Sequence, residues 1–178
     1  MLKNFKNLSK SIKSSIVFVV ILIFATGLFR AYTIRNIDYK YRGIKYQTGN
    51  LKYEKPINIE IKGKYVKGIF SPFDKFYGEI IVEDMVFHYS NFTQQVYNYK
   101  KVPLILESGN KGLYGDVFYS NVFKQITIPI REQEGSNKYS WNNRDGWLIS
   151  APCKDRKQAV ELSNVLIPKQ YRGGYSLE

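Results

Sequence analysis

The side chains best suited to nucleophilic chemistry in this 178-residue chain are one thiol and one imidazole. Cys153 is the single cysteine, His88 is the single histidine, and Arg156 lies three residues after the cysteine. A cysteine is a strong nucleophile as its thiolate, and a neighbouring histidine can take up the thiol proton. These three residues form the candidate catalytic set of an enzymatic interpretation.

The order of these residues resembles that of the sortases, which are membrane-anchored transpeptidases with a β-barrel domain. An apolar segment near the N-terminus is followed by strand-like sequence, then by His88, Cys153 and an arginine, either Arg156 or Arg172. The resemblance implies a cysteine transpeptidase. The local sequence differs, because a sortase cysteine ends a Thr-Leu-x-Thr-Cys strand, whereas Pro152 directly precedes Cys153 here. Sortase-like catalysis is therefore the alternative to a non-enzymatic function.

Other signatures of enzymes, metal sites and cofactor sites are missing from the sequence. There is no glycine-rich phosphate loop, no Gly-x-Ser-x-Gly and no His-Glu-x-x-His. With one histidine, one cysteine and no close group of carboxylates, we predict neither a bound metal nor a cofactor. The single cysteine also rules out an intrachain disulfide, which argues against a eukaryotic secreted protein and is compatible with a bacterial exported one.

A second group of candidates lies in the polar stretch 132–144, which we expect to be a surface loop. Trp141 lies in this stretch together with Tyr139 and Arg144. An exposed aromatic side chain beside cations is suited to contacts with a glycan, an anionic polymer or a partner protein. The alternative is that Trp141 is tucked back onto the domain and contributes to folding instead.

One apolar segment precedes the domain that carries these candidates. Residues 14–29 contain no charge, and a helix of this composition suits lipid because its backbone hydrogen bonds are satisfied internally. Sixteen residues span about 24 Å, so residues 30–33 and snorkelling flanking charges are needed to cross a hydrocarbon core of about 30 Å. We predict a basic cytoplasmic tail at residues 1–13, a transmembrane anchor at 14–33 and an extracytoplasmic domain at 34–178.

The same segment also fits a cleavable export signal. Ala25-Thr26-Gly27 has the small-x-small form of a cleavage site, although apolar residues continue beyond it. Four lysines and no acidic residue precede the segment, which favours an N-terminus in the cytoplasm and a domain outside. We therefore expect a single-pass protein of the cell membrane, and cleavage of the segment stays open.

The chain is basic, with 27 Lys and Arg against 15 Asp and Glu and a formal net charge of +12. Such an excess favours anionic partners. The basic residues are scattered singly along strand-like sequence without base-stacking aromatics, so we predict no binding to nucleic acid. The expected partners are the lipid bilayer and either an anionic cell-wall polymer or another envelope protein.

The domain reads as a β-rich α+β fold. Ile57, Ile59 and Ile61 alternate with polar residues, as in a strand with one buried face. Residues 48–50 and 108–112 are predicted turns, Gly63 is expected to separate two strands of a hairpin, and Gly43 could mark a bulge. About eight strands precede one helix at 155–166, which we expect to pack over a mainly antiparallel sheet.

The predicted C-terminal helix has a start signal and an apolar face. Asp155 with Gln158 resembles a capping box. The face comprises Ala159, Leu162, Val165 and Leu166. Gly173-Gly174 is expected to lead into a loose tail. Because no catalytic motif accompanies this fold, the sequence predicts a membrane-anchored, non-enzymatic exported domain that binds or scaffolds at the bacterial cell envelope.

Overall fold

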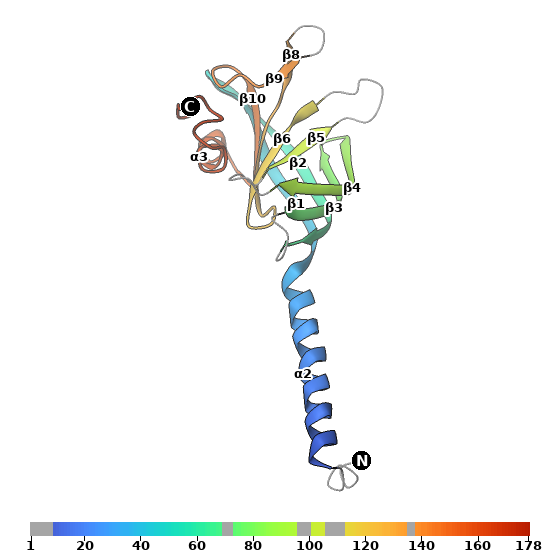
Figure 1. Ribbon diagram of the computed structural model, residues 1–178. Helices are drawn as coiled ribbons and strands as arrows, with labels where there is room; N and C mark the ends of the chain where they lie inside the picture. Colours follow the sequence, from blue (N-terminus) through green and yellow to red (C-terminus); the bar gives the residue numbers. More distant parts are fainter. Residues whose placement is uncertain (1–8, 69–72, 96–100, 106–112, 135–137) are drawn as a thin grey trace. The chain divides into compact units, whose positions relative to one another are not determined.

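The computed structural model describes residues 9–68, 73–95, 101–105, 113–134 and 138–178. The chain forms two compact units, Met1–Arg35 and Asn36–Glu178. The first unit contains an apolar helix, and the second is mostly antiparallel β-sheet with a helix near its C-terminus (Figure 1). The predicted combination of a β-rich domain with one C-terminal helix is therefore confirmed.

The apolar helix α2 runs from Lys10 to Thr33. Its first turn is closed by the backbone N–H of Lys13, which donates to the carbonyl of Ser9 over 3.1 Å. The Thr26 hydroxyl donates within the helix to the carbonyls of Leu22 and Ile23. The 24 residues of α2 span about 36 Å. The segment Lys10–Phe29 is long and apolar enough to cross a membrane and is not buried, a criterion that a signal sequence also meets.

One antiparallel sheet of eight strands forms the body of the second unit. Its strand order is β4-β3-β2-β1-β10-β7-β6-β5. The strands are β1 (Ile34–Gln47), β2 (Asn50–Val66), β3 (Phe73–Val82), β4 (Met85–Gln95), β5 (Lys101–Ile105), β6 (Leu113–Ser120), β7 (Gln125–Pro129) and β10 (Trp147–Ala151). Two further strands, β8 (Glu132–Glu134) and β9 (Lys138–Ser140), pair as a separate ribbon.

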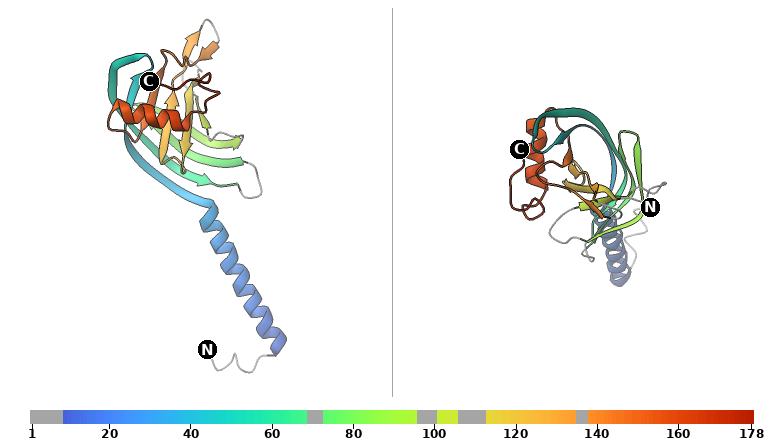
Figure 2. Two further views of the ribbon diagram at one scale, coloured as in Figure 1. Left: turned by 90° about the vertical axis from the view of Figure 1, so that its left-hand side faces the viewer. Right: turned by 90° about the horizontal axis from the view of Figure 1, so that it is seen from above.

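The sheet is strongly curled around its main core (Figure 2). Its outermost strands, β4 and β5, approach each other, and the Tyr89 hydroxyl on β4 donates to the Pro103 carbonyl on β5 over 2.9 Å. The concave face is lined by buried side chains from all eight strands, including Ile37, Ile59, Ile80, Phe87, Leu104, Val117, Ile128 and Ile149. Curling lets one sheet bury a core between its own strands, without a second sheet against its concave face.

The helix α3, Arg156–Leu166, packs against the convex face of the same sheet. Strand β1 serves both cores because its side chains alternate: Tyr39 and Tyr41 contact the concave core, whereas Ile44 and Tyr46 contact the core beneath α3. Gly43 lies within the continuous strand, where a Cβ atom would lie 2.7 Å from the Ser150 carbonyl oxygen. Close approach of β10 therefore explains the glycine, and the expected bulge is not needed.

The prediction that Gly63 ends a strand is wrong. Strand β2 continues through Gly63, which pairs with Gly78 of β3. Both residues have strongly positive φ, 154° and 152°. A Cβ atom on Gly63 would lie 2.2 Å from the Tyr77 carbonyl oxygen. The two glycines thus permit close contact between paired backbones, and the connection to β3 comes later in the chain.

The start of α3 agrees with the predicted cap, but its buried face differs. The Asp155 carboxylate accepts the Gln158 backbone N–H over 2.9 Å. Ala159 is buried, as predicted. Val165 is 77% exposed, so the prediction that it belongs to the packed apolar face is wrong. Ser163 is fully buried instead, because its hydroxyl joins those of Tyr46 and Ser150 at 2.7 Å each.

Two further predictions about the C-terminal third are corrected. The stretch 132–144 contains the β8–β9 ribbon and is not a loop throughout. The C-terminal tail is held in place: Leu177 is 5% exposed, and its backbone N–H and carbonyl both bond to the Asn164 side chain. Thr48 and Gly49 form the turn predicted at 48–50, with Asn50 already in β2, whereas the turn predicted at 108–112 lies outside the described residues.

Strands β6 and β7 are joined by a left-handed turn that the sequence did not indicate. Asn121, Val122 and Phe123 have φ values of 46°, 56° and 64°. Val122 is β-branched, and a β-branched residue with such a positive φ has a strained backbone. The turn places Phe123 in the concave core, stacked on Tyr119 with ring centroids 4.1 Å apart, and its carbonyl accepts the Tyr41 hydroxyl.

Candidate functional site

The residues of the sortase-like hypothesis lie on separate parts of the domain. His88 is on β4, where its Nδ1 lies 3.1 Å from a Glu79 carboxylate oxygen and its side chain is 59% exposed. Cys153 follows β10, and three strands separate β10 from β4 in the sheet. With neighbouring strands about 4.8 Å apart, the structure does not bring the imidazole and the thiol within hydrogen-bond reach.

The surroundings of Cys153 favour the neutral thiol. It is 5% exposed in the core beneath α3, and burial, followed by the nearby Asp155, raises the pKa of the thiol to about 11. Arg156 points its guanidinium at the backbone carbonyls of Gln47 and Glu178 and stacks over the Tyr46 ring. An activated thiolate requires the opposite environment, with a lowered thiol pKa and solvent access.

The residues of the second predicted site lie near one another in sequence, but they have different surroundings. Trp141 is half-buried and stacks on Tyr171, with ring centroids 5.9 Å apart, and its indole Nε1 is buried. Tyr139 lies on β9 and is partly exposed. Arg144 is exposed and borders a hollow of about 290 Å³ next to Tyr175.

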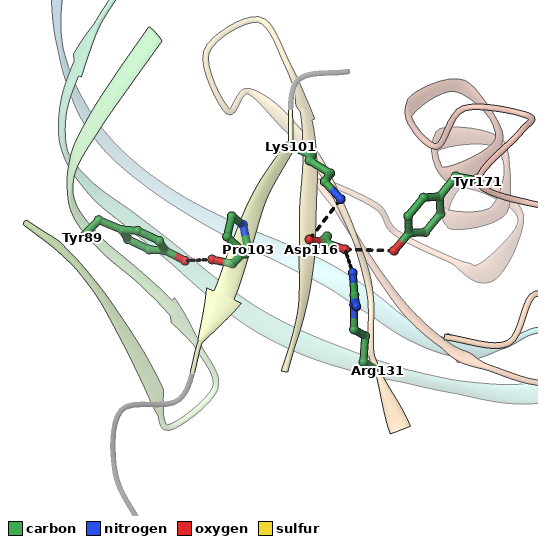
Figure 3. Close-up of polar contacts among 6 residues, drawn as sticks. All are labelled: Tyr89, Lys101, Pro103, Asp116, Arg131 and Tyr171. Carbon is green, nitrogen blue, oxygen red and sulfur yellow. Dashed lines mark hydrogen bonds and ion pairs between the residues drawn. The ribbon is translucent and has the colours of Figure 1, made fainter. Parts of the chain in front are cut away.

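A buried ionic cluster that the sequence did not reveal is centred on Asp116 of β6 (Figure 3). Asp116 is 2% exposed. Its carboxylate accepts hydrogen bonds from Arg131 at 2.6 Å and from the Tyr171 hydroxyl at 2.9 Å, and it lies 3.5 Å from the Lys101 ammonium. Two hydrogen-bond donors and one ammonium group thus surround a single buried carboxylate.

The Asp116 cluster joins the C-terminal segment to β5 and β6 at one end of the strand order. Tyr171 also packs its ring edge-on against Phe118, and the Lys101 ammonium lies 5.5 Å from the centre of the ring. Burial, followed by Asp116, raises the pKa of the Tyr171 hydroxyl, so this hydroxyl stays a donor. Among the buried polar side-chain atoms of this cluster, Arg131 Nε alone has no hydrogen-bond partner, so we interpret the cluster as a structural contact.

A basic hollow of about 550 Å³ opens where β1 meets the connection from β10 to α3. Lys40 and Arg42 border it from β1, Lys154 borders it from the connection, and Gln158 borders it from the first turn of α3. The connection is held against β1 by the Cys153 backbone N–H, which donates to the Arg42 carbonyl over 3.2 Å. Side chains far apart in the sequence thus gather positive charge around one concave surface.

No group of three or more His, Cys, Asp or Glu residues suited to a metal occurs in the part of the chain that the structure describes. Comparison with known proteins adds no assignment, because no family model, curated protein or solved structure matches this chain. The chemistry of the site therefore follows from its own residues.

The two clusters that sequence reasoning missed have little local signal. Lys101 and Asp116 lie on β5 and β6, Arg131 lies between β7 and β8, and Tyr171 belongs to the C-terminal segment, so their contact depends on the strand order. Asp116 lies within β6, between residues of an otherwise largely apolar strand. A charged residue inside an apolar strand pattern was the one available hint, because such a residue is buried only with partners.

Proposed function

We propose that this protein is a membrane-anchored, extracytoplasmic binding or scaffolding protein of the bacterial cell envelope, without enzymatic activity. The observation that carries the proposal is α2, whose segment Lys10–Phe29 is long and apolar enough to span a bilayer and is not buried against the rest of the protein. In water, so much exposed apolar surface would be strongly unfavourable. In lipid the same surface is accommodated.

An uncleaved anchor is supported over a cleaved signal by the length of the helix. Helix α2 continues through Ala25, Thr26 and Gly27 to Thr33, so the small residues lie inside a regular helix. The Thr26 hydroxyl is satisfied by carbonyls of its own helix, as lipid-facing hydroxyls require. The proposed orientation, with the N-terminus in the cytoplasm, rests on the N-terminal lysines of the sequence.

A binding role is supported over the sortase-like alternative by the placement of its residues. Cys153 is buried with a raised thiol pKa, and His88 is paired with Glu79 on a different part of the sheet. The proposed contacts of the domain remain an anionic cell-wall polymer or another envelope protein. Trp141, Tyr139 and Arg144 are retained as candidate contacts, with α2 as the contact to the lipid bilayer.

The proposal is tested by treating intact cells with a protease that cannot cross the membrane. The full-length chain should be found with the membranes, and the protease should remove the domain and leave a fragment that contains α2. A full-length chain in the soluble cytosol contradicts the anchor. Membrane-bound chain that stays protected in intact cells, but is cleaved after lysis, contradicts the orientation.

A further inference from the structure

We propose that the basic hollow bordered by Lys40, Arg42 and Lys154 binds the phosphate groups of a polyol phosphate polymer, such as a chain of glycerol phosphates. This inference rests on the proposed function, because it names the class of anionic polymer and the surface that would bind it. The hollow belongs entirely to the second unit, and its walls come from β1 and from the connection between β10 and α3.

The positive charge of the hollow is largely uncompensated. Neither Arg42 nor Lys154 has an ion pair among the described residues. Lys40 lies 3.3 Å from Glu60, but the same carboxylate also binds Lys62 at 2.6 Å, and the Lys40 side chain is 69% exposed. One carboxylate thus serves two ammonium groups, and the bordering cations can still bind an anion.

The nearby carboxylates of Asp155 and Glu54 keep their charge, and both accept hydrogen bonds from the first turn of α3. The Asp155 carboxylate accepts the Gln158 backbone N–H, and Glu54 accepts the Arg156 backbone N–H, both over 2.9 Å. The Gln158 side-chain oxygen accepts the Lys154 backbone N–H over 3.1 Å. The attraction of the hollow for an anion therefore comes from the three cationic side chains, not from free helix N–H groups.

The shape and lining of the hollow favour a multivalent phosphate polymer. Its volume of about 550 Å³ is larger than one phosphate needs and falls within the range of ligand sites. A guanidinium matches the oxygens of a phosphate in a bidentate manner, and lysines add point charges. Three cations around one hollow can contact successive phosphates of a chain.

Two other anionic ligands fit less well. A membrane surface is normally bound by cations together with inserted apolar side chains, and none of the exposed large apolar residues of the domain lines this hollow. Nucleic acid is normally bound with aromatic stacking as well as charge. The bordering aromatic residue, Tyr41, is half-buried and donates its hydroxyl to the Phe123 carbonyl.

The test measures binding of a glycerol-phosphate oligomer to the full-length protein in a neutral detergent. The double variant Arg42→Gln/Lys154→Gln should weaken binding at least about tenfold, because two charge-assisted contacts are lost. The matched control Lys52→Gln/Lys124→Gln removes the same charge at exposed positions away from the hollow. It should weaken binding less than about threefold, since distant exposed charges are screened.

Several outcomes would overturn the site. Equal losses of affinity in both double variants would show that the ligand is attracted by the overall charge of the protein. If the wild-type chain does not bind the oligomer measurably, this class of ligand is excluded. Binding of polyglutamate as tight as that of the phosphate oligomer would show no preference for phosphate. Tighter binding to anionic lipid vesicles, or to single-stranded DNA, would assign the surface to those ligands instead.

Both substituted side chains are exposed, so the variants should keep the thermal midpoint of the wild type. If the double variant unfolds, the single variant Lys154→Glu replaces it and should weaken binding by a similar factor through charge reversal. Failure of the site is separable from failure of the proposed function. The binding assay does not depend on where the protein resides in the cell, and the protease assay does not depend on the hollow.

Discussion

At the scale of single residues, Asp116 illustrates how a charged side chain becomes part of a core. Its carboxylate is the least exposed acidic group among the described residues, and it is held by Arg131, Tyr171 and Lys101. Removing one partner of a buried ion pair leaves the other desolvated charge without compensation, which is more destabilising than losing an exposed pair.

The substitution Asp116→Asn should therefore lower the free energy of unfolding by about 2 to 4 kcal/mol. The measurement is denaturant unfolding of the full-length chain in detergent, followed by tryptophan fluorescence. Glu79→Gln is the matched control, because it breaks the exposed pair with His88 and should change stability by less than about 0.5 kcal/mol. Equal effects of both substitutions would contradict a structural role for the Asp116 cluster.

Trp141→Ala tests whether this residue packs or binds. Its ring stacks on Tyr171, which in turn bonds to Asp116, so removal should lower the unfolding free energy by about 2 to 3 kcal/mol. Tyr139→Ala, on the ribbon strand β9, should change it by less than about 1 kcal/mol. Unchanged stability in Trp141→Ala, together with weaker association with envelope material, would instead make Trp141 a contact residue.

Cys153 gives a prediction about reactivity and pH. Burial raises the pKa of its thiol from 9.0 to about 11, and burial raises the pKa of Tyr41 from 10.0 to about 12. Both groups lose their proton more easily in the unfolded chain. Their contribution to stability should thus be complete below pH 9 and should decline as the pH rises through the interval up to about 12.

A maleimide should accordingly label Cys153 slowly in the folded protein at pH 8 and rapidly after unfolding in denaturant. His88→Ala should not alter either labelling rate, because His88 lies on β4 and Cys153 follows β10, from which three strands separate β4. Rapid labelling of the folded chain that slows in His88→Ala would support the sortase-like alternative.

At the scale of elements, Gly63 and Gly78 set the contact between β2 and β3. Gly63→Ala should lower the unfolding free energy by about 3 kcal/mol or more, because its Cβ would collide with the Tyr77 carbonyl and its φ is positive. Gly174→Ala is the control: its φ is also positive, but no atom lies within 4 Å of the added Cβ. It should cost about 1 kcal/mol, and equal losses would contradict the steric argument.

The elements that could be predicted from the sequence are those with a strong local signal. Alternating isoleucines predicted β2, and Asp155 with Gln158 predicted the start of α3. The continuation of β2 through Gly63 could not be predicted, because a glycine pair across two strands has the same local signal as a turn. Nor could burial of Ser163, since its partners come from β1 and β10.

The candidate site was less predictable than the fold, for the same reason. Two cations of the hollow, Lys40 and Arg42, lie on β1, and the third, Lys154, lies in the connection after β10. The pairing of β1 with β10 brings them together. The aromatic and cationic residues of 132–144 were conspicuous in sequence, but the most prominent of them, Trp141, is largely engaged with Tyr171. Contacts that depend on strand order leave no trace in local composition.

At the scale of the whole molecule, the proposed membrane-bound function requires that α2 stay attached to the domain in the mature protein. A retained helix of 24 residues holds the domain at the membrane, whereas cleavage near Ala25-Thr26-Gly27 would release it. The two outcomes differ in mass and in the treatment that extracts the protein from membranes.

The most direct test is the intact mass of the protein recovered from cells after successive extraction with high salt and with detergent. We expect release by detergent and not by salt, with the mass of the whole chain, 20.8 kDa, apart from modification of its first residue. Recovery without detergent, or a mass that lacks the residues up to about Gly27, would contradict the membrane-anchored account.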